Sequence, residues 1–60
     1  MTMPRVFSIE CESVTGLIKA TLNVEKIFQT CMLEGEHYLT ETFSLEDKHF
    51  LVVTVWNSEE

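Results

Sequence analysis

The sequence predicts a small α+β domain with the element order ββαββ, in which one helix packs on one face of a four-stranded sheet. Two patterns carry this prediction. Residues 5–12 and 17–24 alternate between apolar and polar side chains, and residues 24–34 change to helical spacing. The rest of the chain is rich in β-branched and aromatic residues, which favour strands. Sixty residues are enough for one domain, so we treat residues 1–60 as a single unit.

A first β-hairpin is predicted from strict alternation with a period of two residues. One face of residues 5–12 and one face of residues 17–24 are apolar, as in strands that are buried on one side. The four residues between them would form the turn, with Gly16 available for a positive φ. The register that aligns the two apolar faces also sets Glu10 opposite Lys19, which favours the same pairing.

Helical spacing follows directly after this hairpin. Four apolar residues recur at positions i, i+3, i+4 and i+7, namely Val24, Ile27, Phe28 and Cys31. Asn23 is a favourable N-cap residue, and Gly35 stands where a glycine often ends a helix. The spacing therefore predicts a helix over residues 24–34.

A second hairpin is predicted to join residues 37–44 to residues 49–56 through a polar turn. Its register stays open, because Leu39 and Phe43 share a face with Glu41 in any pairing of the strand. We expect a β-bulge, or a specific partner for Glu41, to resolve this conflict.

The last predicted strand is apolar on both faces over residues 50–56. Such strands are typically central in a sheet and covered on both sides. One short helix covers one face only, so we expect a second copy of the chain, or another protein, to cover the other. This feature and the small size of the chain favour a homodimer.

The predicted element order is similar to the β-grasp arrangement of ubiquitin-like and immunoglobulin-binding domains, in which the first and last strands pair in the middle of the sheet. A sheet completed across a dimer fits the same order. Sulfur-carrier members of that group end in Gly-Gly. The present chain ends in Asn57-Ser58-Glu59-Glu60, so the resemblance does not imply that activity.

Charge and hydropathy narrow the range of partners. Ten acidic side chains outnumber four basic ones, which gives a formal net charge of −6. Direct nucleic-acid binding requires clustered Lys and Arg, whereas the basic residues of this chain lie apart. The start of the chain lacks the pattern of a signal peptide, and no apolar run reaches about 20 residues. We therefore expect no direct nucleic-acid binding, no membrane insertion and a cytoplasmic location.

Residues with catalytic or metal-binding chemistry are few and scattered. Cys11, Cys31, His37 and His49 include no pair at the two-to-four-residue spacing of zinc sites, so we expect neither a metal nor a cofactor. Both cysteines lie on apolar stripes and are predicted to be buried free thiols. A redox-responsive domain that uses these two thiols is a weaker alternative. No nucleophile–base motif or glycine-rich loop is present, so we expect no enzymatic activity.

The function that these observations favour is a small acidic protein-binding or inhibitor module, of the kind that phages and mobile elements encode. Such a module would act by occluding a basic surface of a larger host protein. The candidate partner-binding residues are Glu10 and Glu12 for charge and Tyr38 and Trp56 as aromatic anchors. The alternative is a homodimeric structural or regulatory subunit without inhibitory activity. Acidity that serves solubility alone is the competing interpretation of the charge.

Overall fold

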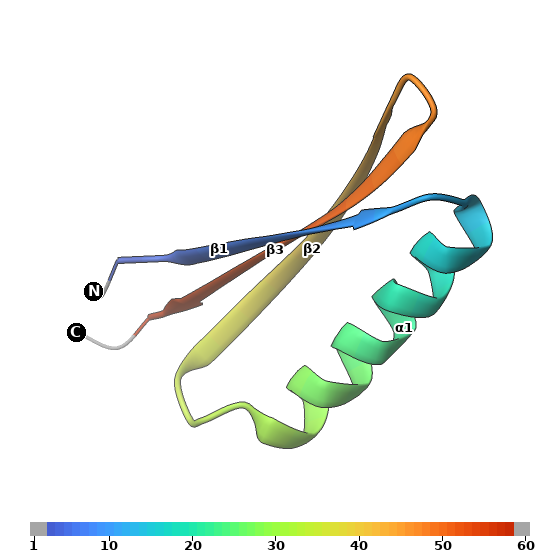
Figure 1. The fold of residues 1–60 in the computed structure, drawn as a ribbon. Coiled ribbons are helices and arrows are strands. Elements are labelled where there is room, and N and C mark those ends of the chain that lie inside the picture. The colour runs from blue at the N-terminus through green and yellow to red at the C-terminus, as the bar shows by residue number, and fades with distance from the viewer. Residues whose placement is uncertain (1–2, 59–60) are drawn as a thin grey trace.

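The computed structural model describes residues 3–58, which form an α+β domain with the order βαββ (Figure 1). The elements are β1 (Arg5–Cys11), α1 (Val14–Cys31), β2 (Glu36–Leu45) and β3 (Lys48–Asn57). The three strands of this described part form one antiparallel sheet in the order β1-β3-β2. The helix lies along one side of that sheet (Figure 1).

The predicted four-stranded ββαββ sheet is wrong, because residues 17–24 belong to α1 and form no strand. The reason begins at Ser13, which has an extended backbone and accepts a hydrogen bond from the Gly16 backbone N–H at 3.0 Å through its side chain. This is an N-cap, which satisfies one of the backbone donors that a helix start leaves without a partner. The residues expected to turn a hairpin therefore begin a helix of 18 residues. The observed order βαββ therefore differs from the β-grasp order that the sequence suggested.

Packing explains why the helix replaces the second predicted strand. Along α1 the apolar residues that contact the core recur every three or four positions, namely Leu17, Ala20, Val24 and Phe28. This stripe crosses the boundary at residue 24 without a break, so one long helix covers the sheet continuously. The alternating residues Ile18 and Leu22 lie on another side of the helix and are exposed. Lys19 is also exposed there, and its expected partner Glu10 pairs with Lys48 instead, at 3.2 Å.

The second hairpin and the central position of the last strand are both confirmed. β2 and β3 pair without interruption from Glu36↔Asn57 to Leu45↔Lys48, so the strand contains no bulge. The two residues between the strands make the turn, and Glu46 adopts a left-handed φ of 57° there. β3 pairs with β1 on its other side, in the centre of the sheet.

The core is small and lies between α1 and one face of β3. Among the described residues, the buried side chains are Leu51, Val53 and Val55. Partly buried residues from the helix and from β2 surround them, including Phe28 and Tyr38. The prediction of two buried thiols is wrong for Cys31, which is exposed, whereas Cys11 is half-buried.

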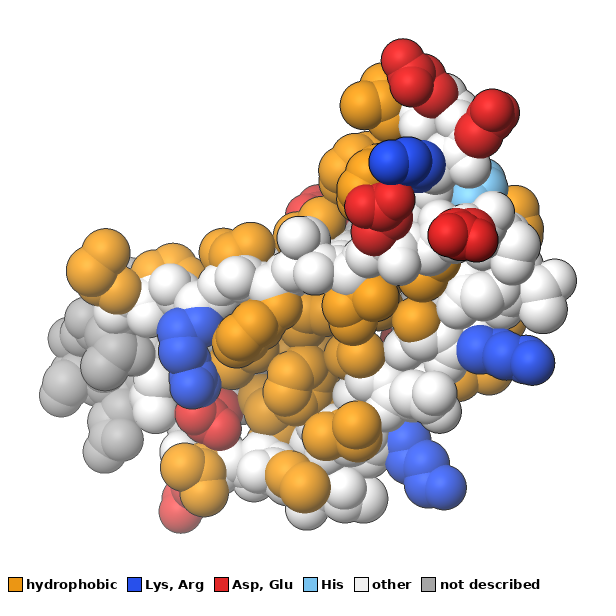
Figure 2. Space-filling model, in the orientation of Figure 1, with side chains coloured by type: hydrophobic (Ala, Val, Ile, Leu, Met, Phe, Trp, Pro, Cys, Tyr) orange, Lys and Arg blue, Asp and Glu red, His pale blue; other side chains and the backbone are white. Residues whose placement is uncertain are grey.

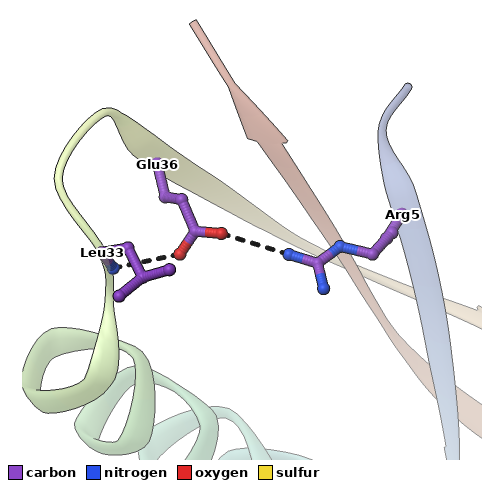
Figure 3. A network of polar contacts seen from close by, with 3 residues as sticks. All are labelled: Arg5, Leu33 and Glu36. Atoms are coloured by element: carbon purple, nitrogen blue, oxygen red, sulfur yellow. Dashed lines mark hydrogen bonds and ion pairs between the residues drawn. The ribbon is translucent and has the colours of Figure 1, made fainter. Parts of the chain in front are cut away.

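A polar network closes the end of the sheet where α1 leads into β2 (Figure 3). The Glu36 side chain accepts a hydrogen bond from the Leu33 backbone N–H at 3.0 Å and forms an ion pair with Arg5 at 3.3 Å. Gly35, between them in sequence, has a φ of 87°, which L side chains rarely adopt. The same glycine carbonyl accepts a hydrogen bond from the Ser58 backbone N–H, so the loop is held to the end of β3.

Candidate protein-binding surface

The face of the sheet opposite α1 is apolar, and no described element covers it. The strand registers place one alternating set of side chains from all three strands on this side. We call this surface the open face. Its apolar members are Val6, Leu39, Phe43, Leu45, Phe50, Val52 and Trp56. Leu39 and Phe43 are 50% and 51% exposed, which is high for large apolar side chains in the interior of a strand.

Aromatic rings pair across β2 and β3 at both ends of the open face. The Phe43 and Phe50 rings stack with their centroids 5.0 Å apart and an angle of 20° between their planes. At the other end the His37 ring stacks on Trp56, with the centroids 5.6 Å apart. His37 Nε2 also shares a hydrogen bond with Ser58 Oγ at 2.9 Å. Stacking holds these rings in place and makes the two ends of the face preorganised.

Few charges interrupt the open face. Glu10 and Lys48 form an ion pair along its β1 side. Glu41 lies opposite Val52 in the register and between Leu39 and Phe43 along β2. It is exposed and forms no ion pair or hydrogen bond with any described residue. The conflict seen in the sequence is thus resolved by exposure: Leu39, Glu41 and Phe43 do share a face, and that face is uncovered.

The predicted site residues fall in different environments. Glu10 and Trp56 both lie on the open face, and Trp56 is partly buried against its neighbours. Glu12 is exposed between β1 and α1. Tyr38 lies on the other side of the sheet, where its ring centroid is 5.2 Å from that of Phe28 and the side chain is part of the core.

Exposed apolar residues of the open face were missed as site residues, among them Leu39 and Phe43. The signal was present in the sequence, since Leu39 and Phe43 flank Glu41 on one side of the strand. An apolar pair beside a carboxylate indicates a surface that is both apolar and accessible to water.

A second apolar surface lies on the helix side, between β1 and α1. Side chains from both elements and from β3 line a groove of about 390 Å³, which we call the β1 groove. Its lining residues are Phe7, Ser8, Ile9, Val24, Phe28 and Val53. Figure 2 shows apolar side chains gathered between β1 and α1 in this region. Polar atoms contribute little to the lining, so the groove suits apolar side chains.

Acidic side chains gather at the end of the molecule that carries the β2–β3 turn (Figure 2). Glu46 and Asp47 form that turn, and Glu10 and Glu12 lie at the neighbouring end of β1. Lys48 is the basic residue among them, held by Glu10. This end is therefore negative. Glu59 and Glu60, at the C-terminus of the sequence, lie outside the described residues.

Other chemistry has little support within residues 3–58. No group of three or more His, Cys, Asp or Glu in this range could hold a metal ion. Ser44 Oγ and His49 Nδ1 lie 2.7 Å apart, but no described carboxylate bonds to that histidine and the pair is not enclosed. No helix in this range is both long enough and apolar enough to cross a membrane.

Comparison with protein-family models, with curated proteins and with solved structures finds no match for this chain.

Proposed function

We propose that the protein is a small binding module that docks its open face on a larger protein and occludes a basic surface there. The observation that carries this proposal is the exposure of a largely apolar sheet face, with stacked aromatic rings at both ends. Contiguous apolar patches on small proteins mark interaction sites, and aromatic residues dominate the binding energy of interfaces. In this proposal Trp56 and Phe43 are the anchors.

Charge identifies the chemistry of the partner. Glu41 stands among apolar neighbours without an ionic partner in the described chain. Burying a carboxylate without compensation is costly, so a surface that covers Glu41 must supply a Lys, an Arg or hydrogen-bond donors. A second copy placed on the open face brings another Glu41 and another net charge of −6. A basic partner therefore fits this face better than a second copy.

The acidic end of the molecule adds to the same preference. Glu10, Glu12, Glu46 and Asp47 lie beside the open face, so a basic surface is attracted before contact. Long-range attraction of this kind raises the association rate and weakens as salt rises. Affinity then depends on the apolar anchors. Such a module inhibits by covering a surface, needs no catalytic group, and would work in the cytoplasm of a cell that carries a phage or mobile element.

The test is quantitative capture of a partner from host lysate, followed by kinetics on the purified pair. Phe43→Ser and Trp56→Ala should each raise the dissociation rate at least tenfold, because each removes a ring from the open face. Leu33→Ser is the matched control, since Leu33 is 70% exposed in the loop before β2 and away from that face. Glu41→Gln should weaken binding, and reversing Glu10 and Glu12 to Lys should slow association. A complex that is indifferent to salt and to all of these changes would refute the proposal.

A homodimeric structural or regulatory subunit without inhibitory activity is the second candidate function. The β1 groove, on the opposite side of the sheet from the open face, favours it. The two candidates use different surfaces and can be tested separately.

A further inference from the structure

We propose that β1 is a dimerisation strand, which pairs antiparallel with β1 of a second copy about a two-fold axis at Ser8. This pairing would join two three-stranded sheets into one six-stranded sheet and cover the β1 groove of both copies. It goes beyond the proposed function, because it leaves the open face of each copy free for another protein.

The backbone of β1 is an unprotected edge. One side of the strand pairs with β3 over seven consecutive residues, and no described element pairs with the other side. Proteins usually protect such an edge with a proline, a bulge or charges. Within β1 there is no proline, the pairing with β3 has no bulge, and the charged side chains are Arg5 and Glu10 near the two ends. The middle of the strand is open to another strand.

On the side of the sheet that faces α1, the side chains of β1 are apolar, and the helix covers them incompletely. Phe7 and Ile9 face the α1 side of the sheet, yet they remain 50% and 38% exposed. Val24, Phe28 and Val53 continue this apolar surface into the β1 groove. A strand added beside β1 would place every second side chain over the groove, which is how edge-strand addition combines backbone pairing with side-chain burial.

The sequence of β1 is complementary to itself in this arrangement. With Ser8 on the two-fold axis, Phe7 lies opposite Ile9 of the second copy on the helix side, and the same contact occurs twice. Val6 then lies opposite Glu10 of the second copy on the other side, and no like charges face each other. All seven residues of the strand find a partner, and Phe7 and Ile9 stay on the side of the groove.

The other edge of the sheet offers no comparable gain. The helix-side residues in the middle of β2 are Thr40, Thr42 and Ser44, which are polar. An added strand would bury little apolar area on the helix side of β2, and on the other side Glu41 stands between the exposed Leu39 and Phe43. Strand addition is therefore expected at β1 and not at β2.

The chain exposes more surface than a typical folded monomer of its mass, by an amount comparable to one side of a standard interface. The accessible surface is 4708 Å², whereas a folded monomer of this mass exposes about 4,000 Å². The excess of about 700 Å² is close to the roughly 800 Å² that each partner buries in a standard-size interface. With three buried side chains among the described residues, the monomer has little core of its own.

Sedimentation velocity over a range of protein concentrations tests the proposal. The wild-type chain should sediment at twice its monomer mass of 7.0 kDa at micromolar concentration. Ser8→Lys places two ammonium groups opposite each other at the two-fold axis and should raise the dimer dissociation constant by about tenfold or more. The exposed Thr42→Lys, on the β2 edge, is the matched control and should leave the dimer unchanged. Circular dichroism checks that each variant keeps its fold.

Cross-linking tests the register itself. Ser8→Cys, with Cys11 and Cys31 replaced by Ser, should form a covalent dimer when oxidised by glutathione disulfide, whereas Thr42→Cys in the same background should not. A wild-type chain that stays monomeric up to about 100 µM would overturn the proposal, which predicts a dimer at micromolar concentration. A dimer that survives Ser8→Lys but dissociates with Phe43→Ser would overturn it too, because the second copy would then occupy the open face. If Phe43→Ser no longer captures the partner but still forms the dimer, both the binding proposal and the dimer proposal are supported. Loss of capture in Phe7→Ser from a chain whose wild type is monomeric would assign the β1 groove to a different protein and refute the dimer, because Phe7 lines the groove and lies away from the open face.

Discussion

Arg5 Nη2 of β1 and Glu36 Oε2 of β2 lie 3.3 Å apart, so an ion pair joins the two edge strands at one end of the sheet (Figure 3). The partners differ in environment. The Glu36 side chain is 15% exposed and also accepts the Leu33 backbone N–H, whereas the Arg5 side chain is 63% exposed. The carboxylate is thus the fixed centre of the network, and the guanidinium approaches it from the solvent.

We expect Glu36→Ala to lower the free energy of unfolding by about 1–2 kcal/mol, because it removes the acceptor for the loop N–H. Arg5→Ala should lower it by less than about 0.5 kcal/mol, since an exposed ion pair contributes little. Glu36→Gln keeps an acceptor for Leu33 and should fall between the two. Urea unfolding measures all three. Equal losses for Arg5→Ala and Glu36→Ala would show that the ion pair, and not the loop contact, is the stabilising element.

Ser13 and Asn23 provide a direct test of where the helix starts. Ser13→Ala should destabilise the protein by about 1 kcal/mol, because it removes the side chain that caps α1. Asn23 lies exposed in the interior of the helix, so Asn23→Ala should stabilise it by about 0.5 kcal/mol through helix propensity. Chemical denaturation of both variants measures the difference. If Asn23→Ala destabilises the protein and Ser13→Ala does not, the helix starts at residue 23 and not at Ser13.

Gly35→Ala should destabilise the protein by about 1–2 kcal/mol, since the residue has a φ of 87°. An added Cβ would also lie 3.2 Å from Asn57 Oδ1. Gly35→Asn should destabilise the protein less than Gly35→Ala, although Asn is larger, because Asn tolerates left-handed backbone better than Ala does. Thermal unfolding followed by circular dichroism compares the two. A loss for Asn as large as or larger than that for Ala would assign the effect to crowding at Asn57.

The two cysteines should respond differently to a thiol reagent and to mutation. Cys31 is exposed and should be modified rapidly in the folded protein, while the half-buried Cys11 should react more slowly. Cys31→Ser should change the free energy of unfolding by less than about 0.5 kcal/mol, whereas Cys11→Ser should lower it by about 1 kcal/mol. Labelling of each single-cysteine variant gives the two rates. Equal rates would contradict the difference in burial.

The position of the thiols also bears on redox function. Cys11 lies beside Gly16 at the start of α1, and Cys31 is the last residue of that helix. A helix rises about 1.5 Å per residue, so its 18 residues separate the two thiols far beyond the reach of a disulfide. An internal disulfide switch would require the helix to unfold.

The candidate site could be predicted only in part. Trp56 and Glu10 were identified from the sequence and lie on one surface, the open face. Tyr38 was predicted as a second aromatic anchor, but the continuous register of β2 places it on the opposite side of the sheet from Trp56, against Phe28. A period of two residues shows which side chains share a face, yet it does not show which face the helix will cover.

Three features follow from the pattern of residues alone: the second hairpin, the first strand and the central position of the last strand. The first strand alternates with a period of two, and the second hairpin is rich in β-branched and aromatic residues, so neither has the apolar spacing of a helix. A strand that is apolar on both faces is typically central in a sheet. The tertiary structure alone decided residues 17–24, where alternating and helical spacing are both present in the same letters. A strand there would have ended the apolar stripe at residue 24. The helix instead continues that stripe from Leu17 to Phe28 over the buried side of β3, and this larger contact outweighs the local pattern.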